Sequence, residues 1–247
     1  MTKLKYSLSE LCISQAARAW QNDGEILATG IGLLPRIAVS LSKNLYNPDL
    51  MMTDGEAFLV DKPYALGLGI KPALEGYMNY SRVFDLLWSG ARHAMVTPTQ
   101  LDSLGHMNIS CIGDYNHPKV QLLGVRGFPG NSINHRNSMF IPNHSKKVFV
   151  DGRVDMAASL GFDSKDYSPD IGIVITNLCV FDFNGKDNAL RLLSIHPGHS
   201  LEDIKENTGF KFDILSESET ELPSEEELMV IRNDLDPKNL RDSIFGD

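Results

Sequence analysis

The stretch ILATGIGLLPRIAVSLSKNLYNPDLMMT, residues 26–53, decides the fold class of this chain. Its first part, 26–32, is an apolar run that ends in a glycine turn, as is typical of a buried strand. Residues 34–46 then repeat apolar side chains at helical spacing, and a second strand pattern follows Pro48. This order of strand, helix and strand predicts an α/β fold, with a parallel-rich open sheet and flanking helices.

The length of the chain, 247 residues, is enough for one large α/β domain with a substantial core. We expect this domain to span 1–215. The rest, 216–247, is strongly acidic and contains Pro223 ahead of a helical run. We interpret it as an arm that packs on the body or on a partner.

Other segments predict further elements of the same domain. Apolar runs rich in β-branched residues at 146–152, 171–183 and 190–198 indicate strands. The segment 61–80 is rich in Gly and Pro, which predicts a long ordered loop over the strand ends, where function is often located.

Charge and composition exclude several classes of function. The formal net charge of -9 argues against nucleic-acid binding, because phosphates require clustered Lys and Arg. The N-terminus lacks the features of a signal peptide, and no apolar run reaches the ~18 residues of a membrane span. Cys12, Cys111 and Cys179 lie far apart, which indicates neither a disulfide framework nor a zinc site. We expect a cytoplasmic protein that binds neither nucleic acid nor membrane.

A glycine turn joins the first predicted strand to its helix. Gly30 and Gly32 lie where exposed amides and the helix dipole favour anions. The third glycine of a dinucleotide fingerprint is missing, as is its acidic residue ~20 positions on, so a structural turn remains the alternative.

A second glycine loop, LGVRGFPGN at 123–131, surrounds one arginine. Glycine amides can stabilise an oxyanion, and Arg126 could pair with a carboxylate or phosphate. The other candidates in this loop are Gly124, Gly127, Gly130 and Asn131. A plain turn is an equally good interpretation of the loop.

Two carboxylates, Asp54 and Glu56, follow the second predicted strand in TDGEAFLV, residues 53–60. Asp-Gly is common turn chemistry. Both residues would also stand at the carboxyl edge of a parallel sheet, where ligands of α/β proteins usually bind. Both interpretations stay open.

No metal site or common catalytic motif is evident. His135, His144 and His196 match no metal-ligand spacing, so we assign no metal. The chain has neither a Gly-x-Ser-x-Gly nucleophile elbow nor a phosphate loop ending in Gly-Lys-Ser or Gly-Lys-Thr. The lack of these two motifs argues against the common classes of hydrolase and kinase.

Taken together, several short segments resemble the beta subunit of class I coenzyme A transferases of the glutaconate type. They are DGEILATGIGLLPRIAVSL, TPTQLDSLGHMN, the 123–131 loop, NHSKKVFVDGRVDMAASLG, SIHPG and the TGF at 208–210. Taken in order, these segments extend over nearly the whole chain. The resemblance implies a coenzyme A transferase-like fold over 1–215 and an active site shared with an alpha subunit in an α2β2 heterotetramer.

The resemblance also implies site residues. In the transferases a beta-subunit glutamate attacks the acyl thioester and forms a glutamyl thioester with coenzyme A, while a glycine-loop amide stabilises the oxyanion. The position in this chain that matches the transferase glutamate is Asp54, or Glu56 if the alignment is shifted by two residues. Aspartate is one methylene shorter, and a misplacement of about 1 Å can cost ~100-fold in rate. The substrate-binding candidates are Gly30, Gly32, Gln100, Gly124, Gly130 and Asn131.

Arg126 stands where the transferases tend to have a small residue, and its guanidinium could hold a carboxylate or enolate. With TDGEAFLV and GVRGFPGNSINHRN, it makes the chain similar to the COCHEA-CoA hydrolases, the steroid ring-opening branch of the family in cholesterol degradation. The resemblance implies hydrolysis of a cyclohexenone carboxyl-coenzyme A by a retro-Claisen-type step, without a cofactor beyond the coenzyme A of the substrate. Arg126 and the Gly127 amide would stabilise charge, with Asp54 or Glu56 ordering water.

Two alternatives remain open. The first is a transferase that moves coenzyme A between carboxylic acids, with Glu56 or Asp54 as the nucleophile. The second is a structural subunit that only scaffolds an active alpha partner.

Overall fold

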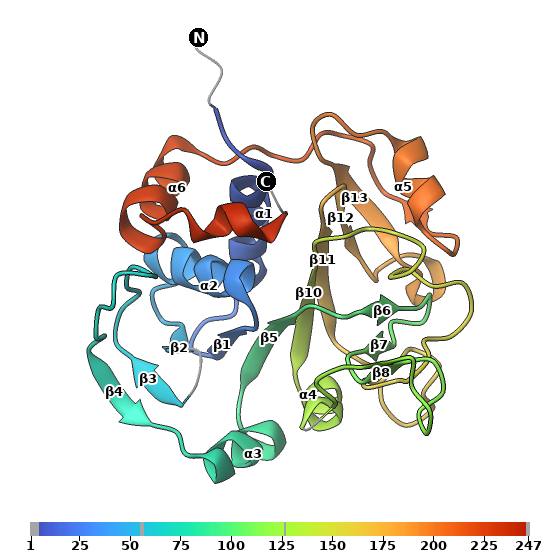
Figure 1. The fold of residues 1–247 in the computed structure, drawn as a ribbon, viewed down its shortest axis with the longest axis horizontal. Helices are drawn as coiled ribbons and strands as arrows, with labels where there is room; N and C mark the ends of the chain where they lie inside the picture. The colour runs from blue at the N-terminus through green and yellow to red at the C-terminus, as the bar shows by residue number, and fades with distance from the viewer. Residues whose placement is uncertain (1–4, 55–56, 126, 246–247) are drawn as a thin grey trace. The chain divides into compact units, whose positions relative to one another are not determined.

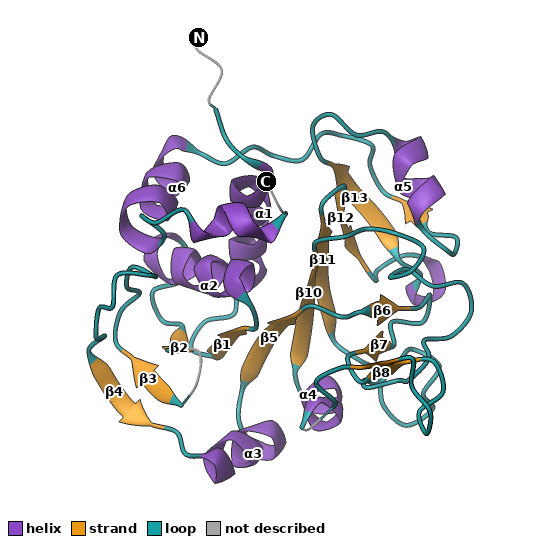
Figure 2. Cartoon of the chain, in the orientation of Figure 1, coloured by secondary structure: helices purple, strands orange, loops and turns teal. Residues whose placement is uncertain are grey.

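The computed structural model describes residues 5–54, 57–125 and 127–245. The chain forms two compact units. The first comprises Met1–Val96 with Glu221–Asp247, and the second comprises Thr97–Thr220. Each contains strands and helices, so the predicted α/β class is confirmed (Figures 1 and 2).

The first unit contains five described strands of a mixed sheet. Its order is β5 (Arg92–Val96), β1 (Leu27–Gly30), β2 (Met51–Thr53), β3 (Phe58–Val60) and β4 (Leu74–Tyr77). β1 pairs in parallel with both neighbours, whereas β3 and β4 are antiparallel. The predicted strand, helix and strand of 26–53 are therefore confirmed. The predicted loop 61–80 contains β4, which pairs with β3.

Helices cover this sheet. α1 (Leu8–Ala17) continues into a 3-10 turn, Arg18–Trp20, and packs on α2 (Leu33–Leu45), which packs on β1. α6 (Glu225–Met229) gathers with them on the same side of β1 and β2 (Figure 1). α3 (Tyr80–Ser89) precedes β5. No helix in the described ranges is long and apolar enough to cross a membrane.

The second unit also contains five described strands of mixed direction. Their order is β10 (Arg136–Ile141), β11 (Ile171–Thr176), β12 (Cys179–Asp182), β13 (Arg191–Ile195) and β14 (Asp213–Ile214). The pairs β10–β11 and β13–β14 are parallel, and the two between them are antiparallel.

Two hairpins and two helices complete this unit. The hairpins are β6 (Gln100–Leu101) with β7 (Met107–Asn108) and β8 (Cys111–Ile112) with β9 (Val120–Gln121). The helices are α4 (Phe128–Asn134) and α5 (Leu201–Asn207), with a short 3-10 turn at Lys186–Asn188.

Two strand predictions in this unit are wrong in detail. The run 171–183 is a hairpin rather than one strand, because the Thr176 hydroxyl accepts hydrogen bonds from the Leu178 and Cys179 amides and turns the chain. In the run 146–152, Phe149 makes only an isolated bridge with Leu101. Its side chain is nevertheless fully buried, which explains the apolar pattern.

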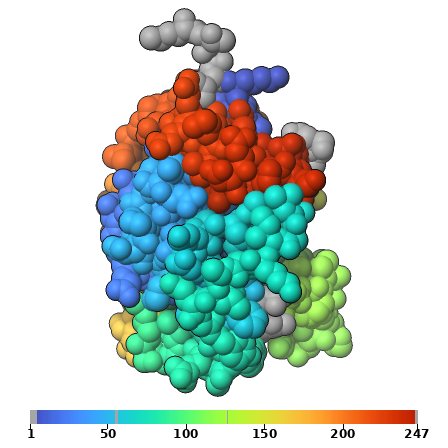
Figure 3. Space-filling view, turned by 90° about the vertical axis from the view of Figure 1, so that its left-hand side faces the viewer, coloured from blue at the N-terminus to red at the C-terminus, as the bar shows by residue number. Residues whose placement is uncertain are grey.

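The C-terminal residues 221–245 pack against the N-terminal part of the first unit (Figure 3), and ion pairs to Glu10 hold them there. Glu10 on α1 accepts from Arg232 at 2.7 Å and pairs with Arg241 at 3.0 Å. Burial would raise the pKa of Glu10, but the Arg232 hydrogen bond, the Ser7 amide and both guanidinium charges lower it overall. Glu227 accepts from Ser14 and Tyr46. These contacts fix the segment on α1 and α2.

Replacing Glu10 with Gln is expected to lower the free energy of unfolding by about 2 kcal/mol, because it removes one of the two carboxylates that pair with the buried Arg241 guanidinium. Urea unfolding of the purified chain measures this. The matched control is Glu221→Gln, since the Glu221 side chain is 73% exposed in its ion pair with Arg18. The control should cost less than about 1 kcal/mol. Equal losses for the two variants would contradict the role of Glu10.

Two buried histidines predict a pH dependence of stability in the second unit. Burial lowers the pKa of His144 to about 3 and that of His196 to about 4. Both values lie below the unfolded value of about 6.5, so the unfolded chain binds more protons in acid. Stability is therefore complete above about pH 6.5 and decreases as the pH falls toward 4.

Urea unfolding between pH 7 and 5 tests this prediction. His144→Gln should flatten the slope by up to about 1.4 kcal/mol per pH unit. His117→Gln is the control, because His117 is exposed, and it should leave the slope unchanged. An unaltered slope in His144→Gln would show that this histidine is not the group responsible.

Candidate functional site

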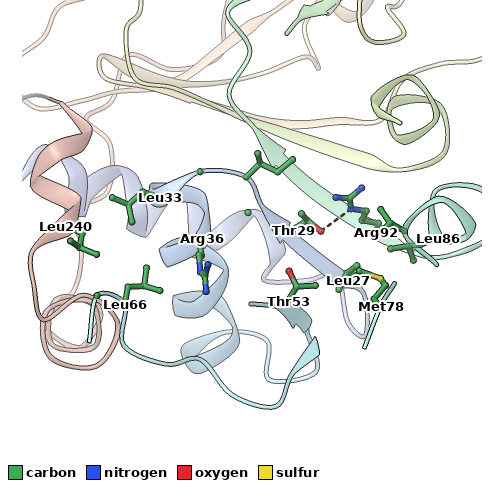
Figure 4. Close-up of a pocket in the computed structure, with 15 residues that line it drawn as sticks. Leu27, Thr29, Leu33, Arg36, Thr53, Leu66, Met78, Leu86, Arg92 and Leu240 are labelled. Atoms are coloured by element: carbon green, nitrogen blue, oxygen red, sulfur yellow. Dashed lines mark hydrogen bonds between the residues drawn. The ribbon is translucent and has the colours of Figure 1, made fainter. Parts of the chain in front are cut away.

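A cavity of about 640 Å³ opens in the first unit, and one face of its sheet forms the floor (Figure 4). Leu27 of β1 pairs with Met51 of β2 and with Arg92 of β5. Because side chains alternate between the two faces of a sheet, Thr29 and Thr53 point the same way as Leu27 and Arg92. All four line the cavity.

The walls come from segments that are far apart in the sequence. They are Leu33 and Arg36 of α2, Leu66 and Gly67 of the 61–80 segment, Met78, Val83 and Leu86 around α3, and Leu240 of the C-terminal segment. The Leu66 amide donates to the Leu235 carbonyl at 2.8 Å, which ties the 61–80 segment to the C-terminal one. The ion pairs of Glu10 with Arg232 and Arg241 therefore also hold a wall of the cavity.

The glycine turn predicted between β1 and α2 forms one end of the cavity. A Cβ at Gly30 would lie 2.3 Å from the Pro35 carbonyl oxygen, so only glycine lets the first turn of α2 come this close. Gly32, with φ of 105°, is the N-cap of α2 in a conformation that favours glycine. Both glycines line the cavity, which agrees with their selection from the sequence.

Two guanidinium groups give the cavity positive charge. The Arg92 Nε donates to the Thr29 hydroxyl at 3.0 Å, and burial lowers the pKa of Arg92 to about 10. Arg36 donates to the Tyr64 hydroxyl, and its guanidinium carbon lies 5.5 Å from the centre of the Tyr64 ring. The remaining described lining residues are apolar, threonine or glycine.

Asp54 directly follows the cavity residue Thr53 and shapes the β2–β3 turn. Its amide donates to the Phe58 carbonyl at 2.9 Å, and its carboxylate accepts from the Phe58 amide at 3.2 Å. The turn interpretation is thus supported, and a catalytic role of Asp54 stays a prediction. Glu56 lies outside the described residues.

The second glycine loop belongs to the other unit and leads into α4. Gly124 has φ of 86°, and its amide donates to the Ile109 carbonyl. Gly127 is the N-cap of α4, and its carbonyl accepts from the Asn131 amide. Gly130 is buried in the helix. Arg126 lies outside the described residues.

Two predicted substrate-binding amides take part in internal networks of this second unit. The Asn131 side chain donates to the Asn137 side chain and is almost fully buried. The Gln100 carbonyl oxygen accepts from the Asn108 side chain at 2.7 Å and from the Asp155 amide at 2.9 Å. These contacts hold β6, β7 and β10 in place, and substrate contacts of Gln100 and Asn131 stay predictions.

Arg36 and Arg92 are the charged cavity residues that were missed from the sequence. Arg36 stands within an apolar helical run and Arg92 at the start of an apolar strand, where a single arginine usually means a solvated edge. No sequence signal places Arg92 beside Thr29, 63 residues away.

No protein-family model matches the chain. Its fold is that of coenzyme A transferase beta subunits: glutaconate coenzyme A-transferase from Acidaminococcus fermentans superposes with a TM-score of 0.82, at 22% identity over 98% of each chain. The crystal structure of Rhodococcus jostii RHA1 IpdAB agrees better, with a TM-score of 0.91 and 37% identity over 97% of this chain and 98% of that one.

Sequence comparison gives the family. The IpdB subunit of the cholesterol ring-cleaving hydrolase of Mycobacterium tuberculosis (strain ATCC 25618 / H37Rv) is 38% identical over 244 residues, which are 95% of this chain and 96% of that protein. The chain belongs to the family of these IpdB subunits. The resemblance predicted from the sequence is confirmed.

Replacing Gly30 with Ala is expected to lower the free energy of unfolding by about 1–3 kcal/mol, because the added methyl group forces α2 away from β1. The control is Gly76→Ala in β4, where the nearest atom to a new Cβ is 3.8 Å away. Urea unfolding compares the two variants. Similar stabilities would mean that the close approach at Gly30 is not a constraint.

Proposed function

We propose that this chain is the beta-type subunit of a hydrolase that opens the last ring of a steroid nucleus, carried as a coenzyme A thioester. The observation that carries this proposal is the 38% identity to IpdB along 95% of the chain. The TM-score of 0.91 to a subunit of IpdAB supports it from the fold.

The active enzyme is a complex with an alpha subunit, arranged as an α2β2 heterotetramer. The Rhodococcus protein IpdAB contains two kinds of subunit, which supports such a partner. A cytoplasmic location fits the three buried cysteines, because buried thiols are usual in a reducing compartment.

The reaction that fits this family is a retro-Claisen hydrolysis. One water molecule adds across the ring enone, which places a hydroxyl on one alkene carbon and a hydrogen on the carbon beside the thioester. A second water molecule, deprotonated by the general base, attacks the ring ketone; the bond from the ketone carbon to the carbon beside the thioester then breaks. The ketone carbon becomes a carboxylate at the end of the opened chain, and the carbanion at the other carbon is delocalised into the thioester before it receives the proton from the general base. No metal or resident cofactor is required for these steps.

Residues of both subunits take part in this proposal. A glutamate of the alpha subunit is the general base. Arg126 and the Gly127 amide stabilise the developing oxyanion and enolate charge. Asp54 or Glu56 orders the water, and the substrate is held by Gly30, Gly32, Gln100, Gly124, Gly130 and Asn131.

A second candidate function is coenzyme A transfer between carboxylic acids. It is favoured by 26% identity to one subunit of the glutaconate coenzyme A-transferase of Acidaminococcus fermentans, over 94% of this chain. This chemistry requires a glutamyl-type thioester at Asp54 or Glu56. Hydroxylamine added to the complex with an acyl-coenzyme A would trap that thioester, and an unlabelled protein would exclude it.

Replacing Arg126 with Ala is expected to reduce ring opening by about 100- to 1000-fold, because a donor to the transition-state charge is lost. The assay follows a cyclohexenone carboxyl-coenzyme A with the purified two-subunit complex. Arg136→Ala is the matched control: Arg136 begins β10, and its side chain is 46% exposed in an ion pair with Asp170. The control should keep full turnover. Full turnover in Arg126→Ala, with the complex intact by size exclusion, would refute the role of Arg126.

A further inference from the structure

We propose that Asn108 is a positioning residue for the glycine loop 123–131, and that it acts through the β7–β8 connection, residues 109 and 110. This inference rests on the proposed function, which assigns charge stabilisation to Arg126 and to the Gly127 amide of that loop. Asn108 does not touch the substrate in this proposal. It holds the backbone to which the loop is hydrogen bonded.

The side chain of Asn108, at the end of β7, uses all of its hydrogen-bonding positions. Its Nδ2 donates to the Gln100 side-chain oxygen and to the Cys111 carbonyl, both at 2.7 Å. Its Oδ1 accepts from the Ser110 amide at 2.9 Å and from the Cys111 amide at 3.4 Å. Asn108 is fully buried, so these bonds are costly to leave unmade. The side chain therefore fixes the β7–β8 connection in one conformation.

The start of the glycine loop is hydrogen bonded to this connection. The Leu122 amide donates to the Ser110 carbonyl at 2.9 Å. Two residues on, the Gly124 amide donates to the Ile109 carbonyl at 3.1 Å. Packing contributes little here, because the Leu123 side chain is 88% exposed and a Cβ at Gly124 would have no atom within 4 Å beyond its chain neighbours. The start of the loop therefore depends on these two hydrogen bonds for its position.

Asp155 supports the same hairpin from the other end of β8. Its carboxylate accepts from the Gly113 amide at 2.8 Å and from the Gln100 side chain at 3.1 Å. The Asp155 amide donates at 2.9 Å to the Gln100 oxygen, which also accepts from Asn108. One network thus holds the chain before and after β8. All of its members belong to the second unit, as does the glycine loop.

The position of the loop matters for rate because an oxyanion donor acts over a short range. A donor must lie about 3 Å from the developing charge, and a misplacement of about 1 Å can cost ~100-fold in rate. Gly127 follows Gly124 by three residues, so a shift at the start of the loop moves its amide. Loss of the Asn108 bonds should therefore lower kcat more than it changes KM.

The other explanation of the network is that it only stabilises the second unit. A residue with that role alone would change the free energy of unfolding but not the turnover of the folded complex. A variant that loses the same kind of hydrogen bonds elsewhere in the chain separates the two explanations.

The first test replaces Asn108 with Asp, which keeps the shape of the side chain but removes both donors of Nδ2. With a cyclohexenone carboxyl-coenzyme A and the two-subunit complex, kcat should fall about 30-fold and KM should change less than about 2-fold. The matched control is Asn47→Asp: Asn47 is buried in the first unit, and its Nδ2 donates to the Trp20 and Gly24 carbonyls, both at 3.0 Å. The control should keep the kcat of the folded complex. Equal losses of kcat in the two variants, or an unchanged kcat in Asn108→Asp, would overturn the proposal.

Asp155 supplies a second pair of variants, because its exposed position makes a failure to fold improbable. Asp155→Ala removes the acceptor of the Gly113 amide and should lower kcat about 5-fold without changing KM. Asp155→Asn keeps an oxygen acceptor and should restore most of the rate. Equal losses in both variants would show that the charge of Asp155 matters rather than its hydrogen bonds, and would refute the network. If Asn108→Asp does not fold, this pair decides.

A double-mutant cycle tests whether Asn108 acts through the loop. In the Arg126→Ala complex, Asn108→Asp should cost about 3-fold in kcat rather than about 30-fold, because one of the two groups that the loop positions is already absent. The same loss in both backgrounds would mean that Asn108 acts independently of the loop, which would overturn the proposal.

Hydrogen exchange of the complex separates this proposal from the proposed function. The Leu122 and Gly124 amides should exchange about 10-fold faster in Asn108→Asp than in the unmodified chain, and at an unchanged rate in Asn47→Asp. If the unmodified complex does not open the ring but exchange at these amides depends on Asn108, the function is wrong and the positioning of the loop stands. If the ring is opened and exchange is unchanged in Asn108→Asp, the function stands and the positioning role is refuted.

Discussion

The close approach of α2 to β1 at Gly30 is the constraint on which the first unit depends. A Cβ at this position would meet the Pro35 carbonyl oxygen at 2.3 Å. Because Gly30 has none, the first turn of α2 lies against the end of the strand, and the amphipathic face of α2 packs on the sheet and on α1. The same approach places Leu33 and Arg36 at the cavity, next to Thr29 on the floor. The close approach at Gly30 thus determines both the packing of α2 and the position of these cavity residues.

The C-terminal segment completes the site from the other end of the chain. Its ion pair between Arg241 and Glu10 is buried, so it contributes less to net stability than to choosing one docked arrangement. That arrangement brings Leu240 to the cavity and Leu235 to the backbone of Leu66. An acidic segment whose composition suggests an arm therefore acts as a fixed wall.

The sequence predicted well the features that depend on neighbouring residues. It predicted poorly the features that depend on contacts between segments far apart in the chain. The strand, helix and strand of 26–53 follow from periodicity and a glycine turn, and both are local signals. The hairpin within 171–183 was missed because one threonine hydroxyl, Thr176, makes the turn inside an apolar run. Arg92 was missed because its importance depends on strand pairing with β1, which no local pattern encodes. Glu56 and Arg126 were selected from local motifs and from the family resemblance, and their roles remain predictions.

Cleavage of a carbon-carbon bond by water is the central claim, and oxygen-18 labelling tests it most directly. The two-subunit complex is incubated in labelled water with a cyclohexenone carboxyl-coenzyme A, and the product is analysed by mass spectrometry. The account predicts one labelled oxygen in the new carboxylate formed from the ring ketone, with the thioester to coenzyme A intact. An unopened ring, or coenzyme A transferred to an added carboxylic acid without label from water, would contradict it.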